Sequence, residues 1–240
     1  MNTQTLIAKL NKIPAEHRVR TLYEAVPWRD RDHFARKIMD PAVKPIRPDM
    51  AVCGPAYTVA DSYMSFEMLD DASKKGSVIV VQTSGCQGTF VGDFMRELAT
   101  RDGALGIVTD GYVTHAASLI RKDLPIFCKG SRIPYAGYKM KGTVQVPITC
   151  GGVIVNPGAF VVGNLDGVMV LTPQEAEDLA EKSRWFFKIL HSLVGEYMNK
   201  GVRYTRVPGV RPYWLHKTAG TKNEDEFYKE WCEKYGKRRK

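Results

Sequence analysis

The spacing of apolar residues divides the chain into three zones. In residues 1–45 apolar side chains recur every three or four positions, as Leu6 and Leu10 do, which is typical of amphipathic helices. Residues 46–172 instead hold short apolar runs that turn residues separate. The helical spacing returns in residues 173–240, which end in a basic tail. We therefore expect a core domain with helical arms at both ends.

Runs rich in β-branched and aromatic residues fill the core zone, and turns such as Asn156-Pro157-Gly158 lie between them. The runs that we expect to be strands are 51–60, 77–82, 104–109, 125–129, 143–149, 153–155, 160–162 and 168–171. Two helices are expected among them, one at 93–101, ended by Gly103, and one at 114–121. Many strands with few helices indicate an α/β fold, a β-rich sandwich or barrel flanked by helices.

The third zone begins with a strong helix signal. Thr172 and Glu175 have the spacing of a capping box, and Pro173 stands at the first helical position. An apolar face then continues to Gly201, so we expect one long helix. The remaining residues are polar, aromatic and rich in proline, and we expect them to wrap around the core or a neighbouring subunit.

Composition narrows the class of protein. The chain has 240 residues, 44% hydrophobic and 25% charged, as in ordinary globular proteins. No apolar run approaches the roughly 18–20 residues of a membrane span, and the N-terminus lacks the pattern of a signal peptide. The five cysteines form no C-x-x-C pair. We therefore expect neither a disulfide framework nor a structural zinc site, and a cytoplasmic location.

The net charge of +9 raises the question of nucleic-acid binding. The basic residues do not form a stripe with interleaved aromatic residues, and no RNA-binding signature is present. Part of the excess lies in the four basic residues at 237–240. We therefore expect the charge to attract small anionic substrates rather than nucleic acid.

A Gly-rich loop at 83–92 leads into an expected helix. Main-chain N–H groups at the start of a helix have no partner within it and attract anions. Those of Gly92, Phe94 and Met95 are therefore candidates to bind the substrate. Asp93, in the first turn, is either a carboxylate that stabilises the helix dipole or an acid that handles protons in the pocket.

A second segment carries further candidates. An apolar run at 104–108 leads to the Asp110-Gly111 turn, and Thr114 and His115 follow. Both segments can meet at one end of a sheet, where α/β folds place their ligands. Asp110 is interpreted first as a turn residue. His115 is either a structural histidine or a general acid or base, and the sequence leaves both open.

Four core segments follow one another in the order of a known family. Residues 53–59 resemble its opening strand, 92–95 its Gly-acidic-Leu-Leu loop, and 110–113 the first half of its Asp-Gly-x-x-Arg-Asp signature. The stretch 146–168 resembles its closing strands. The chain is thus similar to the RraA-like family, whose catalytic members are metal-dependent pyruvate aldolases and oxaloacetate decarboxylases. The resemblance implies a swivelling β/β/α fold and a homotrimer or hexamer with its pocket between subunits.

The resemblance also implies roles for particular residues. In such aldolases the signature Arg holds the pyruvoyl carboxylate, and the signature Asp holds the Mg²⁺ or Mn²⁺ that stabilises the enolate. Their positions are Thr114 and His115 here. Thr114 can hydrogen-bond the substrate but supplies no charge, and the imidazole of His115 suits Zn²⁺ better than Mg²⁺. Arg132 or Lys129 would then have to replace the missing cation. Gln87, in the Gly-rich loop, is a further candidate to bind the substrate.

Three function hypotheses follow. The first is a carbon–carbon lyase or decarboxylase for a 2-oxo or hydroxy carboxylic acid, with Asp93, Thr114 and His115 as catalytic residues. The second is a catalytically silent relative that binds a protein partner, since both signature residues are replaced. The third is an enzyme with other chemistry on the same scaffold, because a fold does not fix a function.

Overall fold

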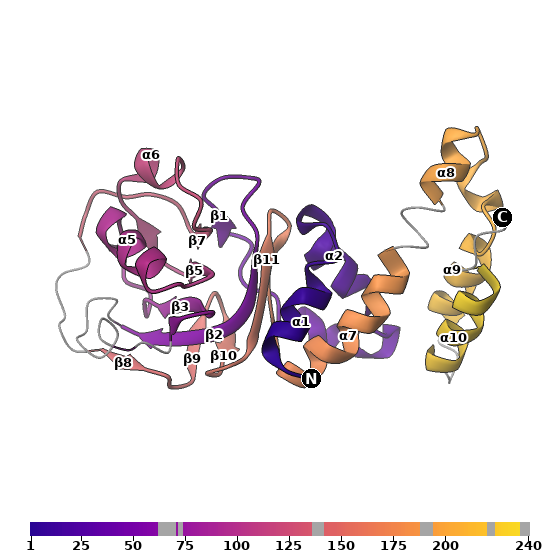
Figure 1. Ribbon diagram of the computed structural model, residues 1–240, viewed down its shortest axis with the longest axis horizontal. Coiled ribbons are helices and arrows are strands. Elements are labelled where there is room, and N and C mark those ends of the chain that lie inside the picture. Colours follow the sequence, from indigo (N-terminus) through magenta and orange to yellow (C-terminus); the bar gives the residue numbers. More distant parts are fainter. Residues whose placement is uncertain (62–70, 72–73, 136–141, 188–193, 220–223, 236–240) are drawn as a thin grey trace. The chain divides into compact units, whose positions relative to one another are not determined.

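The computed structural model describes the chain except residues 62–70, 72–73, 136–141, 188–193, 220–223 and 236–240 (Figure 1). The chain forms two compact units. The first consists of Met1–Val19 and Arg36–Ala176, and the second of Arg20–Ala35 and Glu177–Lys240. Within the part of the chain that is described, no helix is long and apolar enough to cross a membrane. The zone boundaries expected at residues 45 and 172 stay a prediction.

A mixed sheet forms the centre of the first unit, in the strand order β1-β7-β5-β3-β2-β11-β12. The strands β2, β3, β5 and β7 run parallel, whereas β1, β11 and β12 pair antiparallel with their neighbours. β8 pairs with β2, and two small sheets are formed by β9 with β10 and β4 with β6. The strands are β1 (Lys44–Pro45), β2 (Val52–Ala60), β3 (Val78–Gln82), β4 (Thr89–Val91), β5 (Gly106–Thr109), β6 (Tyr112–Val113), β7 (Ile126–Cys128), β8 (Thr143–Val144), β9 (Ile148–Cys150), β10 (Val153–Val155), β11 (Phe160–Asn164) and β12 (Gly167–Leu171).

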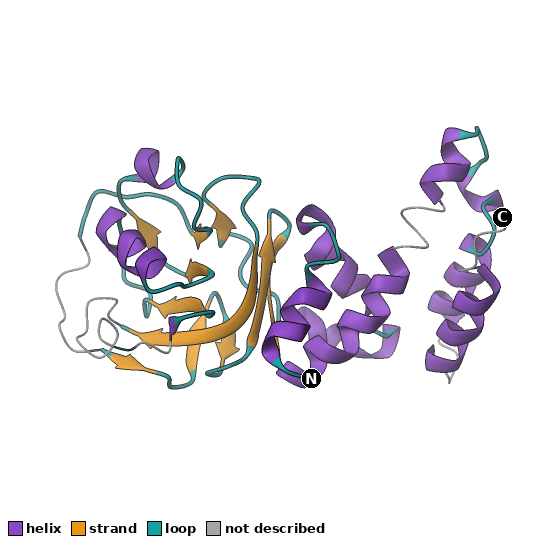
Figure 2. Ribbon diagram, in the orientation of Figure 1, coloured by secondary structure: helices purple, strands orange, loops and turns teal. Residues whose placement is uncertain are grey.

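Both faces of this sheet are buried, which explains why its strands are apolar without interruption. In β3, Val78 and Val80 belong to a core cluster with residues of β9 and β10. The alternate residues Ile79 and Val81 belong to a second cluster that includes Met95 of α5 (Asp93–Arg101). Successive side chains of a strand point to opposite faces, so β3 contributes to both cores, as β2, β5 and β7 do. In Figure 2 the helices of this unit's core and the β9–β10 pair lie on opposite sides of the sheet.

Helices make up the arms. They are α1 (Thr3–Leu10), α2 (Ala15–Ala25), η1 (Trp28–Asp30), α3 (Arg31–Ala35), α7 (Pro173–Phe186), α8 (Val194–Asn199), η4 (Tyr204–Arg206), α9 (Val210–Ala219) and α10 (Glu224–Tyr235). The predicted capping box starts α7. The N–H of Thr172 donates to Glu175 Oε2 at 2.8 Å, and the N–H of Glu175 donates to Thr172 Oγ1 at 3.2 Å. In the second unit the rings of Tyr213 and Trp231 pack 5.6 Å apart.

The α/β fold with a barrel-like mixed sheet is confirmed, and each predicted strand overlaps at least one strand of the structure. The helix predicted at 93–101 is confirmed as α5, and Gly103 follows it with φ +75°. The run 143–149 overlaps two strands, β8 and β9, because Gln145 between them has a left-handed backbone with φ +54°. The helix expected at 114–121 was wrong in length: α6 covers only Ala116–Leu119.

One further expectation needs correction. The loop 83–92 contains a strand, β4, that its glycines concealed. After Gly201 the described part of the chain is mostly helical, in η4, α9 and α10, and its wrapping around the core or a neighbouring subunit stays a prediction. Residues 188–193 of the long helix expected before Gly201 lie outside the described residues. The predicted helix therefore corresponds to α7 and α8 on either side of them.

Candidate active site at the start of helix α5

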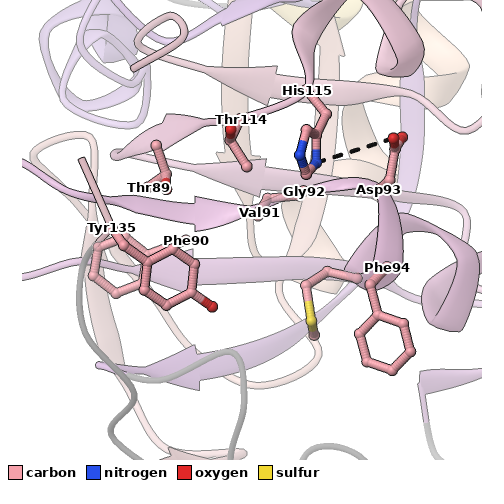
Figure 3. Close-up of a pocket in the computed structure, with 10 residues that line it drawn as sticks. Thr89, Phe90, Val91, Gly92, Asp93, Phe94, Thr114, His115 and Tyr135 are labelled. Carbon is pink, nitrogen blue, oxygen red and sulfur yellow. Dashed lines mark ion pairs between the residues drawn. The ribbon is translucent and has the colours of Figure 1, made fainter. Parts of the chain in front are cut away.

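A pocket of about 380 Å³ lies where β4 leads into α5 (Figure 3). The described residues that line it are Thr89, Phe90, Val91, Gly92, Asp93, Phe94, Met95, Thr114, His115 and Tyr135. β4 and β6 pair in parallel, with Thr89 opposite Tyr112 and Val91 opposite Val113. Both strands therefore end at the same place, and each delivers its following residues to the pocket. The pairing unites the two segments that the sequence offered as candidates.

The start of α5 presents main-chain N–H groups that no side chain caps. Gly92 is the N-cap residue, and the N–H of Arg96 donates to its carbonyl at 3.0 Å. The N–H groups of Asp93 and Phe94 precede that first helical bond and have no acceptor inside the helix. Aligned peptide dipoles add partial positive charge at this end. The arrangement suits a carboxylate or another small anion.

Gly92 lets the two candidate segments approach each other closely. A Cβ atom at this position would lie 3.0 Å from Thr114 Cγ2 and 3.4 Å from His115 Nδ1. Its φ of −138° is open to any residue, so the glycine is needed for space and not for backbone conformation. The N–H of Thr114 donates to the Val91 carbonyl at 2.9 Å, which fixes this approach.

Asp93 and His115 face each other across the mouth of the pocket. Their Oδ2 and Nδ1 atoms are 4.0 Å apart, with side chains 37% and 63% exposed (Figure 3). Asp93 Oδ1 is buried and has no hydrogen-bond partner. His115 has a left-handed backbone, with φ +58° and ψ +34°, which disfavours residues that carry a Cβ atom. This backbone ends β6 abruptly and turns the imidazole toward Asp93.

Thr89 is a polar lining residue that sequence reasoning missed. It is only 2% exposed, and its Oγ1 atom is buried without a hydrogen-bond partner. A buried hydroxyl normally has a partner, because an unsatisfied one costs roughly 1–3 kcal/mol. Its position on the wall of a pocket gives the hydroxyl a reason to remain unpaired within the protein.

Aromatic side chains, which sequence reasoning also missed, form another part of the lining. They are Phe90, Phe94 and Tyr135, and the last two are 63% and 53% exposed. In Figure 3 the rings of Phe90 and Tyr135 overlap, the ring of Phe94 lies apart from them, and His115 lies on the other side of Gly92 from all three. Tyr135 reaches the pocket because it forms a β-bridge with Thr89. No local pattern in the sequence signals that contact.

Two predicted substrate-binding residues are paired with each other outside the lining. Arg132 Nη1 donates to Gln87 Oε1 at 2.8 Å, and the guanidinium lies 5.0 Å from the centre of the Tyr112 ring. Lys129, the alternative cation, lies 3.7 Å from Asp40 Oδ2. Neither cation is among the described lining residues. Their proposed contact with a substrate stays a prediction.

Asp110 makes the contacts expected of a turn residue. Its Oδ1 atom accepts hydrogen bonds from the N–H of Thr83 at 2.9 Å and from Thr83 Oγ1 at 2.8 Å. The carboxylate therefore joins the ends of two neighbouring strands, β3 and β5. It is not among the described residues of the pocket lining.

The donors in the pocket do not fit the metal that the resemblance implies. The described lining offers one carboxylate, Asp93, and one imidazole, His115. No group of three His, Cys, Asp or Glu side chains among the described residues is placed to hold a metal ion. Mg²⁺ and Mn²⁺ prefer oxygen donors, and catalytic zinc usually takes three protein ligands. We therefore derive no step through a metal ion.

Comparison with known proteins gives the family to which this fold belongs. The family model described as aldolase/RraA matches residues 21–170, more than half of the chain. The protein therefore belongs to the RraA-like family. A curated relative from Halalkalibacterium halodurans, provisionally named 4-hydroxy-4-methyl-2-oxoglutarate aldolase, is 34% identical over 147 residues. That match covers 59% of this chain and 70% of the relative.

Solved structures show the same fold. A crystal structure of a protein from Pseudomonas syringae pv. tomato has a TM-score of 0.70 and 24% identity, covering 85% of this chain and 96% of that one. The structure of Streptomyces coelicolor RraAS2, titled an unusual member of the RNase ES inhibitor RraA protein family, has a TM-score of 0.64. It is 24% identical and covers 78% of this chain and 93% of that one. At this identity the likeness concerns the fold alone.

Proposed function

We propose that the protein is an enzyme that forms the enolate of a small 2-oxo carboxylic acid, a carbon–carbon lyase of the aldolase or decarboxylase type. The observation that carries the proposal is one pocket in which an uncapped helix start faces an Asp–His pair 4.0 Å apart. An anion site beside a proton-transfer pair is what enolate chemistry on a carboxylic acid requires. The name of the curated relative supports the same class of reaction.

Each group in the pocket has its own role in the reaction. The N–H groups of Asp93 and Phe94 hold the carboxylate, and the Thr114 hydroxyl donates a hydrogen bond to the 2-oxo oxygen. In the cleavage of a 4-hydroxy-2-oxo acid, His115 removes the proton of the 4-hydroxyl group. The C3–C4 bond then breaks, an aldehyde or ketone leaves, and the bonding electrons form the enolate. His115 returns the proton to C3, which gives pyruvate, and Asp93 stabilises the protonated imidazole meanwhile.

The test is exchange of the methyl protons of pyruvate in D₂O, followed by proton NMR. His115 should remove a C3 proton and return a deuteron, so the methyl signal should decay. Asparagine at position 115 accepts a left-handed backbone but transfers no proton, and His115→Asn should slow exchange by about 10²-fold or more. The variant His17→Asn, which removes a histidine from α2, serves as the matched control. Exchange that survives His115→Asn, or its absence from the wild type, refutes the proposal.

The same exchange experiment tests whether the reaction needs a divalent metal ion. Exchange is measured in EDTA and then with Mg²⁺, Mn²⁺ or Zn²⁺. A base that works through His115 and Asp93 alone should act in EDTA. Activity that appears only with a divalent ion would instead assign His115 to that ion, and the preferred ion would show its ligand chemistry.

A protein-binding role is the alternative, and exposed apolar side chains favour it. Ile133 is 93% exposed and Phe94 is 63% exposed. The resemblance, which places Thr114 and His115 at the positions of the signature Arg and Asp, supports it too. Absence of pyruvate exchange together with saturable binding of a purified ribonuclease would favour this function. In either case we propose a homotrimer or hexamer, and native mass spectrometry should find three or six times 26.9 kDa.

A further inference from the structure

The pocket has two chemically different ends. At the polar end are the helix start and the side chains of Asp93, Thr114 and His115, and the rings of Phe90, Phe94 and Tyr135 lie on the other side of Gly92 from His115 (Figure 3). The Phe94 ring lies apart from the other two rings, and Met95 also lines the pocket. A volume of about 380 Å³ is in the range of sites for molecules larger than a three-carbon acid. A substrate held by its carboxylate at the polar end would therefore extend along the aromatic end.

The charges of the described lining suit one carboxylate and not two. The described residues of the lining include no lysine or arginine, and Asp93 already contributes a negative charge. Arg132 is bound to Gln87, and Lys129 lies beside Asp40. One anionic group can be held by the helix start, but a second carboxylate would meet aromatic rings and a like charge. The Thr89 hydroxyl could donate one hydrogen bond to such a group, but no cation of the described lining would balance its charge.

The exposed rings point to what fills the second end. Phe94 occupies the first turn of α5, where a polar residue would be better solvated, and 63% of it is exposed. Tyr135 is 53% exposed at the same pocket. Aromatic side chains bind a flat apolar group by offset or edge-to-face stacking, in addition to the hydrophobic gain. These features match an apolar and preferably aromatic substituent.

We propose that the substrate is a 2-oxo monocarboxylic acid with an apolar, preferably aromatic, far end, and not a dicarboxylic acid. This inference rests on the proposed function for the orientation of the 2-oxo acid group. In the lyase reaction the carbonyl product that leaves would be an aromatic or aliphatic aldehyde or ketone. The second product would be pyruvate.

Two acids that the lyase reaction cannot cleave test the preference of the far end of the pocket alone. In 2-oxoglutarate and 4-phenyl-2-oxobutanoate the 2-oxo acid group and the two-methylene spacer are the same, and only the terminal group changes from carboxylate to phenyl. Their dissociation constants are measured by isothermal titration calorimetry on the full-length protein. The phenyl acid should bind at least tenfold more tightly. Equal binding, tighter binding of 2-oxoglutarate, or binding of neither acid overturns the proposal.

Variants then assign the preference to the rings. Phe94→Ala and Tyr135→Ala should each reduce the ratio of the two constants at least threefold, and Phe94→Arg should reverse the preference by supplying a cation. Ile133→Ala removes another exposed apolar side chain, 93% exposed and outside the described lining, and should leave the ratio unchanged. A ratio that both ring variants leave unchanged overturns the assignment. Circular dichroism melts confirm that each variant is folded.

The two proposals fail separately. Pyruvate has no far end, so its methyl exchange tests enolate chemistry without reference to the rings. Exchange by the wild type together with tighter binding of 2-oxoglutarate overturns only the substrate class. Tighter binding of the phenyl acid without pyruvate exchange supports the ligand class and refutes the lyase.

Discussion

Serine at position 92 should make the protein more stable than alanine does and yet weaken the binding of pyruvate. Both residues introduce the same Cβ atom, 3.0 Å from Thr114 Cγ2 and 3.4 Å from His115 Nδ1. Both accept the backbone of Gly92, with φ −138° and ψ −170°. The steric effect of a few tenths of an ångström is therefore common to the two variants. The serine hydroxyl is the only difference between them.

The size of each effect follows from the helix start. A serine N-cap accepts a hydrogen bond from an N–H of the first turn and is about 1 kcal/mol more favourable than alanine. In a chain of this length that difference raises Tm by roughly 2–4 °C. The same hydroxyl would accept a hydrogen bond from a main-chain N–H group that otherwise donates to the bound carboxylate. Loss of one hydrogen bond to a charged group costs about 1.5–3 kcal/mol, or roughly 10- to 100-fold in Kd.

Calorimetry measures both quantities on Gly92→Ser and Gly92→Ala. Differential scanning calorimetry should give the higher Tm for the serine variant, and titration with pyruvate should give the weaker binding for the same variant. A serine variant that is the more stable of the two but binds pyruvate as tightly as alanine refutes the reasoning. The N–H groups of α5 would then not form the anion site.

Three further predictions concern His115, an ion pair and the thiols. His115→Gly should raise the free energy of unfolding by about 1 kcal/mol in a urea titration, because glycine accepts φ +58° without strain, while abolishing pyruvate exchange. Burial raises the pKa of Asp102, but hydrogen bonds from Lys74 and Arg101 outweigh it and lower the pKa overall. Asp102→Asn should thus cost roughly 1 kcal/mol at pH 7, because solvent screens this partly exposed pair, and urea titrations should show the difference shrinking as pH falls below about 4. Burial raises the pKa of Cys53 to about 11, so iodoacetamide at pH 8 should label partly exposed Cys86 at least tenfold faster, as measured by peptide mass spectrometry.

The parts of the fold that the sequence predicts are those with a local cause. The strands of the core are apolar runs because both faces of the sheet are buried. Helix α5 lies between a Gly-rich loop and Gly103, whose φ of +75° ends it. The capping box of Thr172 and Glu175 forms both of its reciprocal hydrogen bonds. Each of these signals is complete within about ten residues.

The aromatic side of the pocket could not be predicted, because its cause is not local. Thr89 pairs with Tyr112 between β4 and β6, and it also forms an isolated β-bridge with Tyr135. Both partners are distant from Thr89 in the sequence. The short strand that makes both pairings is hidden in a loop rich in glycine. The left-handed backbone of His115 has no sequence signal either, since neither His115 nor its neighbours are glycine or proline. The resemblance to a family located the polar side of the pocket and said nothing of the rings.

Gly92 and His115 differ in what explains them. At position 92 a Cβ atom would lie 3.0 Å from Thr114 Cγ2, so close packing favours glycine, although serine, aspartate or asparagine would cap the helix. At position 115 the chain carries a side chain where a left-handed backbone favours glycine, and glycine would remove the imidazole. The requirements of folding therefore explain Gly92 but not His115, whereas a site that needs a base beside open N–H groups explains both. The backbone at position 115 thus supports a functional pocket at the start of α5.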